Sequence, residues 1–202
     1  QAYHNECIGS LSLGVKIGET YTDYSQGSVR QTGGTYDLAL SGSGFFTVSV
    51  TDKAGEVHTR YTRDGRFHLT KDGLLVDADG NAVQGQNGNI TIDPSSKNVS
   101  ISATGQITAD GELVDTLNIV DFEDYDYLKK YGDTMYEPVD GATTKDAEGE
   151  ILQGYTEQSN VNVVREMVDM ITITRAYEAS QKVIHSYDSM LDKSVNQVGA
   201  LK

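Results

Sequence analysis

Residues 155–198 read YTEQSNVNVVREMVDMITITRAYEASQKVIHSYDSMLDKSVNQV, and this stretch decides the architecture of the chain. It runs for 44 residues without glycine or proline, the two residues that most weaken a helix. The stretch predicts one long helix, which at ~1.5 Å per residue would extend roughly 60 Å, twice the width of a small domain. Such a helix cannot bury its apolar side against its own domain, so it needs partner helices.

Apolar residues recur along this stretch in alternating steps of three and four residues, the spacing of a heptad seam. The seam has twelve positions: Val163, Glu166, Met170, Ile173, Tyr177, Ser180, Ile184, Tyr187, Leu191, Ser194, Val198 and Leu201. Nine of them are apolar, and Glu166, Ser180 and Ser194 are the polar exceptions. Val164, Met167, Val168 and Ile171 widen the stripe at its start, so the first half of the helix can contact more than one neighbour. The three polar interruptions suit packing in an assembly better than an isolated dimer. The alternative is an amphipathic helix lying along its own domain.

The rest of the chain reads as short strands joined by tight turns. Asp-Gly or Asn-Gly pairs recur every seven or eight residues, and each supplies a residue that tolerates the positive φ of a hairpin. The pairs are Asp64-Gly65, Asp72-Gly73, Asp79-Gly80 and Asn87-Gly88. Several short apolar segments at this spacing indicate an antiparallel β-sandwich or barrel-like domain. We therefore expect a mainly β fold with a long C-terminal α-helix as an assembly arm.

Four regions follow from these patterns. Residues 1–35 hold a strand, in which Leu11, Leu13, Val15 and Ile17 alternate with small or polar residues, and a connecting segment. Residues 36–136 form the β-rich domain. Residues 137–154 form a polar linker and a return strand, and residues 155–202 form the long helix.

Composition excludes several classes of function. The formal charge of −14 opposes binding to nucleic acid, whose phosphates require clustered Lys and Arg, and to anionic membrane surfaces. Cys7 is the one cysteine, so the chain has no intrachain disulfide and no support for a thiolate metal site. No stretch approaches the roughly 20 apolar residues of a membrane span.

The chain offers few residues for catalysis or metal binding. His4, His58, His68 and His185 are dispersed, and none lies beside a Cys or another His at ligand spacing. The run 77–81 begins like a calcium loop, but Ala82 and Gly88 stand where an EF-hand requires Gly and Glu, so we interpret it as a hairpin turn.

The acidic cluster Asp121, Glu123, Asp124 and Asp126 reads as a solvated loop, with weak binding of a hard cation as the alternative. We expect no catalytic residue, no metal and no cofactor, and hence no enzyme. A hydrolase with unrecognised carboxylates is the alternative.

Two segments resemble the signature regions of the flagellar hook and basal-body rod family. The first is SGSGFFTV at 41–48, followed by YTRDGRF at 61–67 and DGLLV at 72–76. The second is QGYTEQSNVNVV at 153–164, followed by EMV at 166–168, MI at 170–171 and RAYE at 175–178. The resemblance covers nearly the whole chain, from about Leu11 to Val198. Length and the QGYTEQSNVN lead-in are most similar to distal-rod subunits, with proximal-rod subunits next and the longer hook protein third.

The resemblance implies a structural role. Subunits of this family are exported through the flagellar type III apparatus without a cleaved signal peptide, and they stack helically into a hollow shaft that transmits torque. It implies a place in the bacterial flagellar basal body, with other copies of the chain, other rod or hook subunits and the export apparatus as partners. In this family an N-terminal helix pairs with the C-terminal helix. The sequence lacks the motif of that helix, so we expect the partner helix to be absent.

The resemblance also implies residue roles. Ser159, Asn160 and Asn162 would open the helix, with Ser159 or Asn160 as caps. Phe45, Phe46, Tyr61 and Phe67 would lie in the core, and Arg63 would pair with a carboxylate that the sequence does not identify. Subunit contacts are expected from Val163, Val164, Met167, Met170, Ile171, Ile173, Tyr177, Ile184, Tyr187, Leu191 and Val198.

One competing function comes from another class of protein. An extracellular β-domain binding module or adhesin on a coiled-coil stalk would combine the same two parts. Such a stalk has no need of the SNVN, EMVDMI and RAYE segments, which distinguish the two readings.

Overall fold

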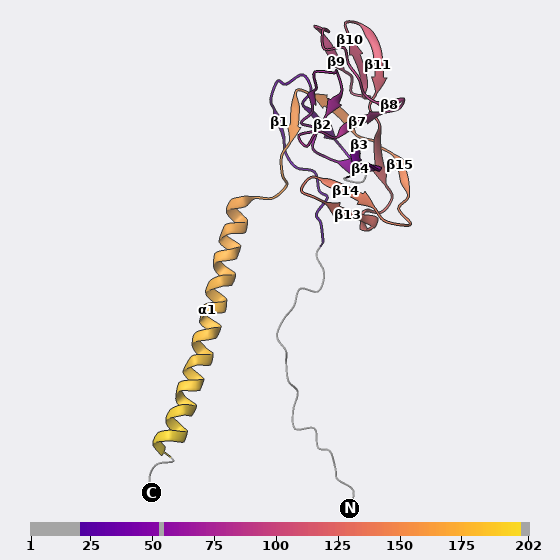
Figure 1. Ribbon diagram of the computed structural model, residues 1–202. Helices are drawn as coiled ribbons and strands as arrows, with labels where there is room; N and C mark the ends of the chain where they lie inside the picture. Colours follow the sequence, from indigo (N-terminus) through magenta and orange to yellow (C-terminus); the bar gives the residue numbers. More distant parts are fainter. Residues whose placement is uncertain (1–20, 53–54, 199–202) are drawn as a thin grey trace, which may run out of the picture.

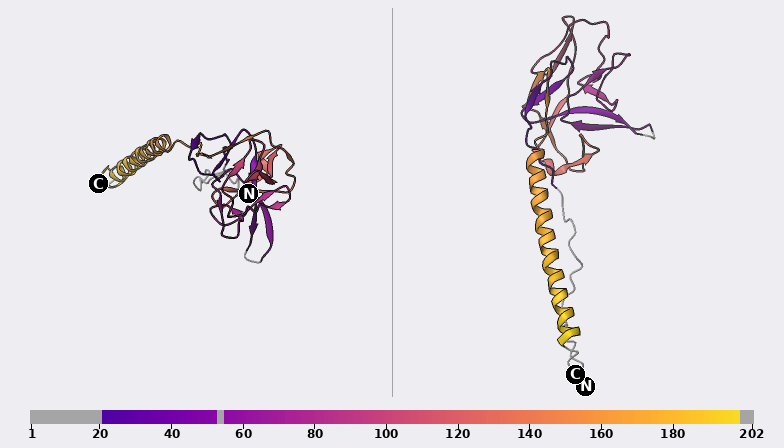
Figure 2. Two further views of the ribbon diagram at one scale, coloured as in Figure 1. Left: turned by 90° about the horizontal axis from the view of Figure 1, so that it is seen from above. Right: turned by 90° about the vertical axis from the view of Figure 1, so that its left-hand side faces the viewer.

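The computed structural model describes residues 21–52 and 55–198, with side chains up to residue 196. It consists of a β domain and one long helix that leaves the domain as a separate arm (Figures 1 and 2). The strand expected over residues 11–17 and the residues Cys7 and Leu201 lie outside the described ranges. The expected mainly β fold with a long C-terminal helix is confirmed.

The largest sheet has ten strands, and every strand pair in it is antiparallel. Its main path runs β13-β14-β4-β3-β7-β6-β5, while β12 pairs with β3 and β15, and β8 pairs with β7. Within the described residues the strands do not close into a barrel. The strands are β3 (Phe45–Thr51), β4 (Val57–Thr62), β5 (His68–Leu69), β6 (Leu75–Val76), β7 (Ala82–Gly85), β8 (Gly88–Asn89), β12 (Ile119–Phe122), β13 (Leu128–Tyr131), β14 (Met135–Pro138) and β15 (Thr144–Asp146).

Three smaller antiparallel sheets complete the domain. One joins β9 (Val99–Ile101), β10 (Gln106–Ala109) and β11 (Glu112–Thr116). Another pairs β2 (Leu38–Ser41) with β16 (Glu150–Gln153), the expected return strand. The third pairs β1 (Val29–Gln31) with β17 (Tyr155–Glu157), so the first and last described strands of the domain lie side by side. The segment expected to be a connection therefore holds β1, and the expected polar linker holds β15 as well as β16.

The alternating residues identified in the sequence form the core. Leu38, Leu40, Phe46 and Val48 are fully buried, and they belong to one apolar cluster that continues through the β domain. Phe67 belongs to the same cluster and meets Phe46 edge to face, with ring centroids 5.3 Å apart. The expected core placement of these two phenylalanines is correct.

A second, aromatic cluster fills the end of the domain nearest β13 and β14. Phe45, Phe122 and Leu128 are buried in it, surrounded by Tyr24, Tyr61, Tyr125 and Tyr136. Its rings meet mostly edge to face or tilted, as Tyr61 and Phe122 do at 4.9 Å and 87°, the arrangement that aromatic quadrupoles favour. The short 3-10 turn η1 (Tyr125–Tyr127) supplies Tyr125 to this cluster.

The helix begins later than the sequence predicts. Residues 155–157 form β17 rather than the first turn of the helix, because their backbone groups pair with β1. Helix α1 spans Val163–Lys193 and continues into one π turn, η2 (Ser194–Val198). The absence of glycine and proline thus predicts the helix but not where it begins. Pairing with β1 holds residues 155–157 in an extended conformation before the helix.

Gly65 is required for a reason other than the one expected. Gly73, Gly80 and Gly88 have the positive φ of hairpin turns, but Gly65 does not. Instead, a Cβ atom at Gly65 would lie 1.8 Å from the carbonyl oxygen of Leu38. The backbones approach this closely because the Leu38 N–H donates to the Gly65 carbonyl at 2.9 Å.

Asp121 is buried, which corrects its expected place in a solvated acidic loop. Its side chain is 0% exposed, whereas Glu123, Asp124 and Asp126 are exposed. Its Oδ1 accepts from the Tyr125 hydroxyl at 2.7 Å and from the Phe122 N–H at 2.8 Å. Lys145 Nζ lies 3.1 Å from Oδ2, an ion pair that is not aligned as a hydrogen bond.

These partners control the titration of Asp121. Burial alone would raise its pKa, but hydrogen bonds from Tyr125, Ser43 and the Phe122 N–H, with Lys145, outweigh it and lower the pKa below the ordinary 3.8. Burial and the bond to Asp121 raise the pKa of Tyr125 to about 12.

We expect the Gly65→Ala substitution to lower the free energy of unfolding by on the order of 2 to 3 kcal/mol, since the added methyl group meets backbone that cannot move aside. Chemical denaturation measures the loss. Gly80→Ala is the matched control, because Gly80 has a positive φ of 88° but nothing within 4 Å of the added Cβ. A larger loss for Gly80→Ala than for Gly65→Ala would contradict the close-approach argument.

We expect Asp121→Asn to cost about 1 to 3 kcal/mol of stability near neutral pH, because it removes a buried carboxylate that the Tyr125 hydroxyl, the Phe122 N–H and Lys145 stabilise. The folded pKa lies below the unfolded one, so the contribution is present above pH 3.8 and is lost as the pH falls through the folded pKa. The difference in free energy of unfolding between wild type and variant, measured by chemical denaturation, should therefore become smaller as the pH is lowered. Glu123→Gln, at an exposed position, serves as control, and a gap that is constant with pH would contradict the assignment.

Candidate functional site

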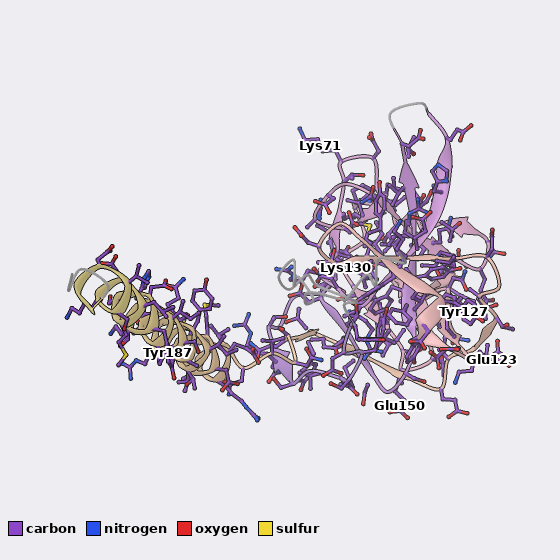
Figure 3. The ribbon with its side chains drawn as sticks, turned by 90° about the horizontal axis from the view of Figure 1, so that it is seen from below. Lys71, Glu123, Tyr127, Lys130, Glu150 and Tyr187 are labelled. Atoms are coloured by element: carbon purple, nitrogen blue, oxygen red, sulfur yellow. The ribbon has the colours of Figure 1, made fainter. Side chains whose placement is uncertain are left out.

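Helix α1 exposes apolar side chains along its whole described length. No residue of its 31 is buried, and the large apolar side chains from Val163 to Leu191 are each between 53% and 71% exposed. Figure 3 shows the side chains of the helix, Tyr187 among them, projecting from an arm that extends away from the β domain. The alternative in which the helix lies along its own domain is therefore wrong.

The expected contact residues all belong to this exposed surface, apart from one that the structure leaves undescribed. Those exposed are Val163, Val164, Met167, Met170, Ile171, Ile173, Tyr177, Ile184, Tyr187 and Leu191. Val198 lies in η2, and its side chain is outside the described part. Among the described residues, no helix combines the length and hydropathy needed to cross a bilayer.

Among the described residues, α1 is stabilised by local interactions alone. Asn162 is the N-cap, and its Oδ1 accepts from the N–H groups of Val164 at 3.1 Å and Arg165 at 3.2 Å. Along the helix, hydroxyls such as that of Thr172 donate to carbonyls four residues earlier. Packing supplies most helix stability in proteins, and α1 has no packing within its own described chain. The exposed apolar surface of α1 is therefore the part of the described structure that would gain most stability from a packing partner.

The segment before the helix is fixed to the segment that enters the β domain. The Gln158 N–H donates to the Ser28 carbonyl at 2.8 Å, extending the β1–β17 pairing. The Asn160 amide nitrogen donates to the carbonyls of Asp23 and Ser25, each at 3.1 Å. Only residues 161 and 162 separate this contact from the first residue of α1.

This geometry reassigns two of the expected helix-opening residues. Asn160 does not cap the helix, because its amide is used across the chain by residues 23 and 25. The Ser159 hydroxyl accepts from the Val161 N–H at 3.2 Å, outside the helix. The N-cap is Asn162.

Arg63 and Glu157 form the strongest contact at this junction, which we call the Arg63–Glu157 clamp. Arg63 Nε donates to Glu157 Oε2 at 3.0 Å, and Arg63 Nη1 donates to the carbonyls of Gly42 and Gly44 at 2.9 and 2.7 Å. The other oxygen of Glu157 accepts from the Gly27 N–H at 2.9 Å. The two side chains are only 20% and 12% exposed, which strengthens their attraction relative to a surface pair.

The clamp brings the two signature segments into contact. Arg63 comes from YTRDGRF, and Glu157 from the lead-in to the helix. Sequence reasoning expected a carboxylate partner for Arg63 but had no signal for which one, since 94 residues separate the pair. Glu157 and the cross-chain role of Asn160 were both missed. Side-chain chemistry allows many pairings, and it is the folded domain that places the end of β4 beside Glu157 of β17.

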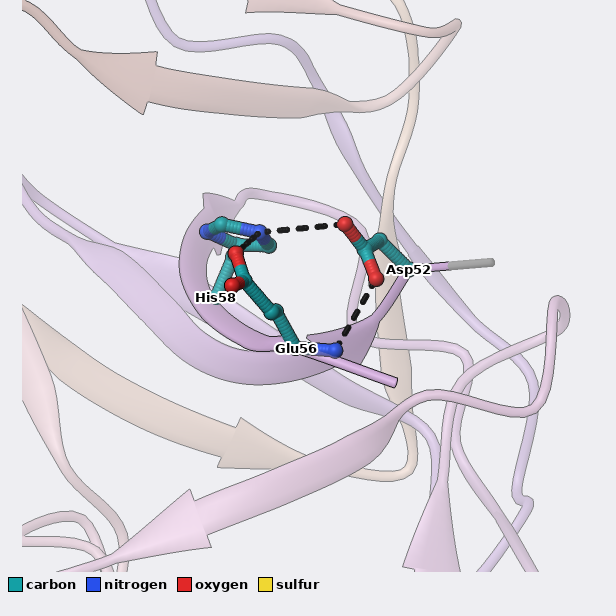
Figure 4. A group of neighbouring side chains, drawn as sticks. All are labelled: Asp52, Glu56 and His58. Atoms are coloured by element: carbon teal, nitrogen blue, oxygen red, sulfur yellow. Dashed lines mark hydrogen bonds and ion pairs between the residues drawn. The ribbon is translucent and has the colours of Figure 1, made fainter. Parts of the chain in front are cut away.

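One group of side chains of metal-ligand type is gathered in the described part of the chain. Asp52, Glu56 and His58 meet at the hairpin between β3 and β4 (Figure 4). His58 Nε2 lies 3.6 Å from Asp52 Oδ2 and 4.0 Å from Glu56 Oε2. The two carboxylates are exposed and the imidazole is partly so, so water screens the contacts among the three side chains.

Other candidate residues lie in strands or in a turn. His68 lies in β5 opposite Val76, while His58 lies opposite Val50. Asp77 Oδ1 accepts from the N–H groups of Asp79 and Asn81, which makes the run 77–81 a hydrogen-bonded turn.

Comparisons with known proteins give the family. Residues 152–198 match the family model described as flagellar basal body rod FlgEFG protein C-terminal, and residues 39–109 match the flagellar hook protein FlgE/F/G D1 domain. The first match covers β17 and the exposed helix, and the second covers much of the β domain. Together they contain both partners of the clamp.

Individual proteins similar to this chain belong to the same family. The chain is 36% identical over 196 residues to the flagellar basal-body rod protein FlgG of Buchnera aphidicola subsp. Schizaphis graminum, covering 91% of this chain and 73% of the relative. It is 32% identical over 205 residues to FlgG of Bacillus subtilis, covering 92% and 74%. It is 34% identical over 181 residues to the rod protein FlgF of Caulobacter vibrioides, covering 89% and 72%. The chain therefore belongs to the family of flagellar basal-body rod proteins of the FlgG and FlgF type.

Proposed function

We propose that this chain is a structural subunit of the bacterial flagellar basal-body rod and that α1 is its assembly element. The observation that carries the proposal is a 31-residue helix with no buried residue and a continuous series of exposed apolar side chains. Burial of apolar surface contributes about 25 cal/mol per Å², so neighbouring helices that cover these side chains stabilise both the helix and the assembly. The contacts are those of Val163 to Leu191 named above, continued by Val198.

The partners in this proposal are other copies of the chain and other rod or hook subunits. The subunit reaches the basal body through the flagellar export apparatus without a cleaved signal peptide, and it acts without catalysis. Names of the relatives support the rod role, and none of those described supports an adhesin. The assembled helices form the inner wall of a hollow shaft, and the β domains form its outer layer.

The Arg63–Glu157 clamp gives the proposal a mechanical element. A torque-transmitting shaft needs its outer and inner layers to turn together. In this subunit the two layers are joined through residues 157–162, which the clamp and Asn160 hold against residues 23–28. We infer that this junction carries load between the β domain and α1.

We expect Met170→Glu, Ile173→Glu or Ile184→Glu in the chromosomal gene to abolish swimming, because each places a charge where an apolar contact is proposed. The β domain should remain folded, since these side chains touch none of it. Swimming in soft agar and thermal unfolding of the purified chain measure the two effects. Thr172→Glu, at a polar position of the same helix, is the matched control. Normal swimming by all three variants would refute α1 as the assembly element.

We expect Arg63→Met to loosen the junction while leaving both parts folded. It removes the ion pair of Glu157 and the donor to the carbonyls of Gly42 and Gly44, at a cost of about 1 to 3 kcal/mol. Spin labels at Lys71→Cys and Ser186→Cys, in a Cys7→Ser background, report the distance between the β domain and α1. Its distribution should broaden in Arg63→Met and not in Arg66→Met, whose Arg66–Asp64 pair lies outside the junction with the arginine 64% exposed. An unchanged distribution in Arg63→Met would show that the clamp does not fix the helix.

A further inference from the structure

Three side chains of metal-ligand type share one side of the β3–β4 hairpin. The two strands pair antiparallel, with Thr51 opposite Val57. The next pair in this register is Asp52 with Glu56, whose carbonyl accepts from the Asp52 N–H at 2.9 Å. Side chains two residues apart on a strand, and those directly opposite on its partner, point to the same side of a sheet. The register therefore gathers Asp52, Glu56 and His58 at the end of the hairpin (Figure 4).

Hydrogen bonds fix the end of this hairpin and orient one of the three side chains. The Gly55 N–H donates to the Asp52 carbonyl at 3.1 Å, and Gly55 has a φ of 88°, which glycine adopts without strain. Asp52 Oδ1 accepts from the Glu56 N–H at 2.9 Å. The other oxygen of this carboxylate faces the His58 imidazole. Hydrogen bonds of this kind orient the ligating side chains in metal sites.

The distances among the three donor atoms fit a small divalent ion. These atoms lie within 4.8 Å of one another. His58 Nε2 is 3.6 Å from Asp52 Oδ2 and 4.0 Å from Glu56 Oε2. Zinc binds imidazole nitrogen and carboxylate oxygen at about 2.0 to 2.2 Å, so two ligands of a tetrahedral ion lie roughly 3.4 Å apart. The two distances from the imidazole exceed this spacing by a fraction of an ångström, which small rotations of exposed side chains supply.

Charge also favours a cation at this position. Asp52 and Glu56 lie directly opposite one another, and like charges at opposite positions of a strand pair destabilise the pair. The formal charge of −14 on the chain adds to their repulsion. A divalent ion held between the two carboxylates replaces this repulsion with attraction.

We propose that Asp52, Glu56 and His58 form a binding site for a divalent transition-metal ion of the zinc type. Imidazole is a ligand for zinc, nickel and copper, whereas Mg²⁺ and Ca²⁺ prefer oxygen ligands and take more of them than this hairpin offers. Water completes the coordination, because the end of the hairpin is open to solvent. The bound ion joins the end of β3 to the start of β4 and so stabilises the hairpin. This site is independent of the role proposed for α1.

Isothermal titration calorimetry with zinc chloride on the full chain, without a histidine tag, tests the site. His4→Gln and Cys7→Ser in every sample remove two further donors to zinc. We expect one zinc ion to bind per chain. His58→Gln, Asp52→Asn and Glu56→Gln should each weaken binding by at least about tenfold, because loss of a mere supporting hydrogen bond already costs roughly 10-fold to 100-fold.

Two variants are matched controls. His68→Gln removes an exposed histidine of β5, and Asp126→Asn removes an exposed carboxylate of the acidic segment. Both should bind zinc with unchanged affinity, and circular dichroism checks that every variant is folded. The NMR signals of the His58 ring should shift on addition of zinc, while those of His68 should not. This second measurement needs no substitution at the site.

Several results would overturn the metal site. Unchanged zinc affinity in His58→Gln would show that the imidazole is not a ligand. An equal loss of affinity in His68→Gln or Asp126→Asn would show that zinc binds diffusely to an acidic chain. Calcium binding as tight as that of zinc would show attraction by the carboxylates alone. His58 ring signals that stay unshifted at saturating zinc would exclude the site whatever the variants do.

Discussion

A 31-residue helix that buries none of its residues places a constraint on everything else in this protein. Helices draw most of their stability in proteins from packing of an apolar face, and the described β domain offers α1 no such packing. Isolation would leave the helix with its Asn162 cap and a few local hydrogen bonds. The fold therefore separates two tasks: the β domain is stable through its own two apolar clusters, whereas in the proposed function α1 completes its packing against other subunits.

The junction lets these two parts meet without sharing a core. Residues 157–160 contact residues 23–28 through the Gly27 N–H and the Asn160 amide, and Glu157 also forms an ion pair with Arg63; all of these contacts are directional. Directional contacts hold an angle, while apolar contacts between α1 and the domain would have hidden the surface needed for assembly. Charge and hydrogen bonding at the base of the helix thus fix its orientation, which apolar packing would fix in an ordinary globular protein.

The sequence predicts the helix and the β domain because both depend on local patterns. Absence of Gly and Pro marks the helix, and alternation of Leu38, Leu40, Phe46 and Val48 marks core strands. Local patterns do not predict three other features: the start of the helix at Val163, the burial of Asp121 and the Arg63–Glu157 clamp. Each depends on residues that are distant in the sequence: β17 pairs with β1, Asp121 with Lys145, and Arg63 with Glu157. The contact residues of α1 remain predictions, since their partners are other molecules.

Pairing of β1 with β17 has a consequence for the architecture of the whole subunit. The chain enters and leaves the β domain through adjacent antiparallel strands, so the domain is attached like a module inserted between two neighbouring points of the backbone. Such a module can be enlarged, trimmed or exchanged without moving those points. If α1 packs in the core of the rod as proposed, the same core can accept outer domains of different size. A subunit carrying a foreign domain with adjacent termini would then display that domain on the outside of the rod.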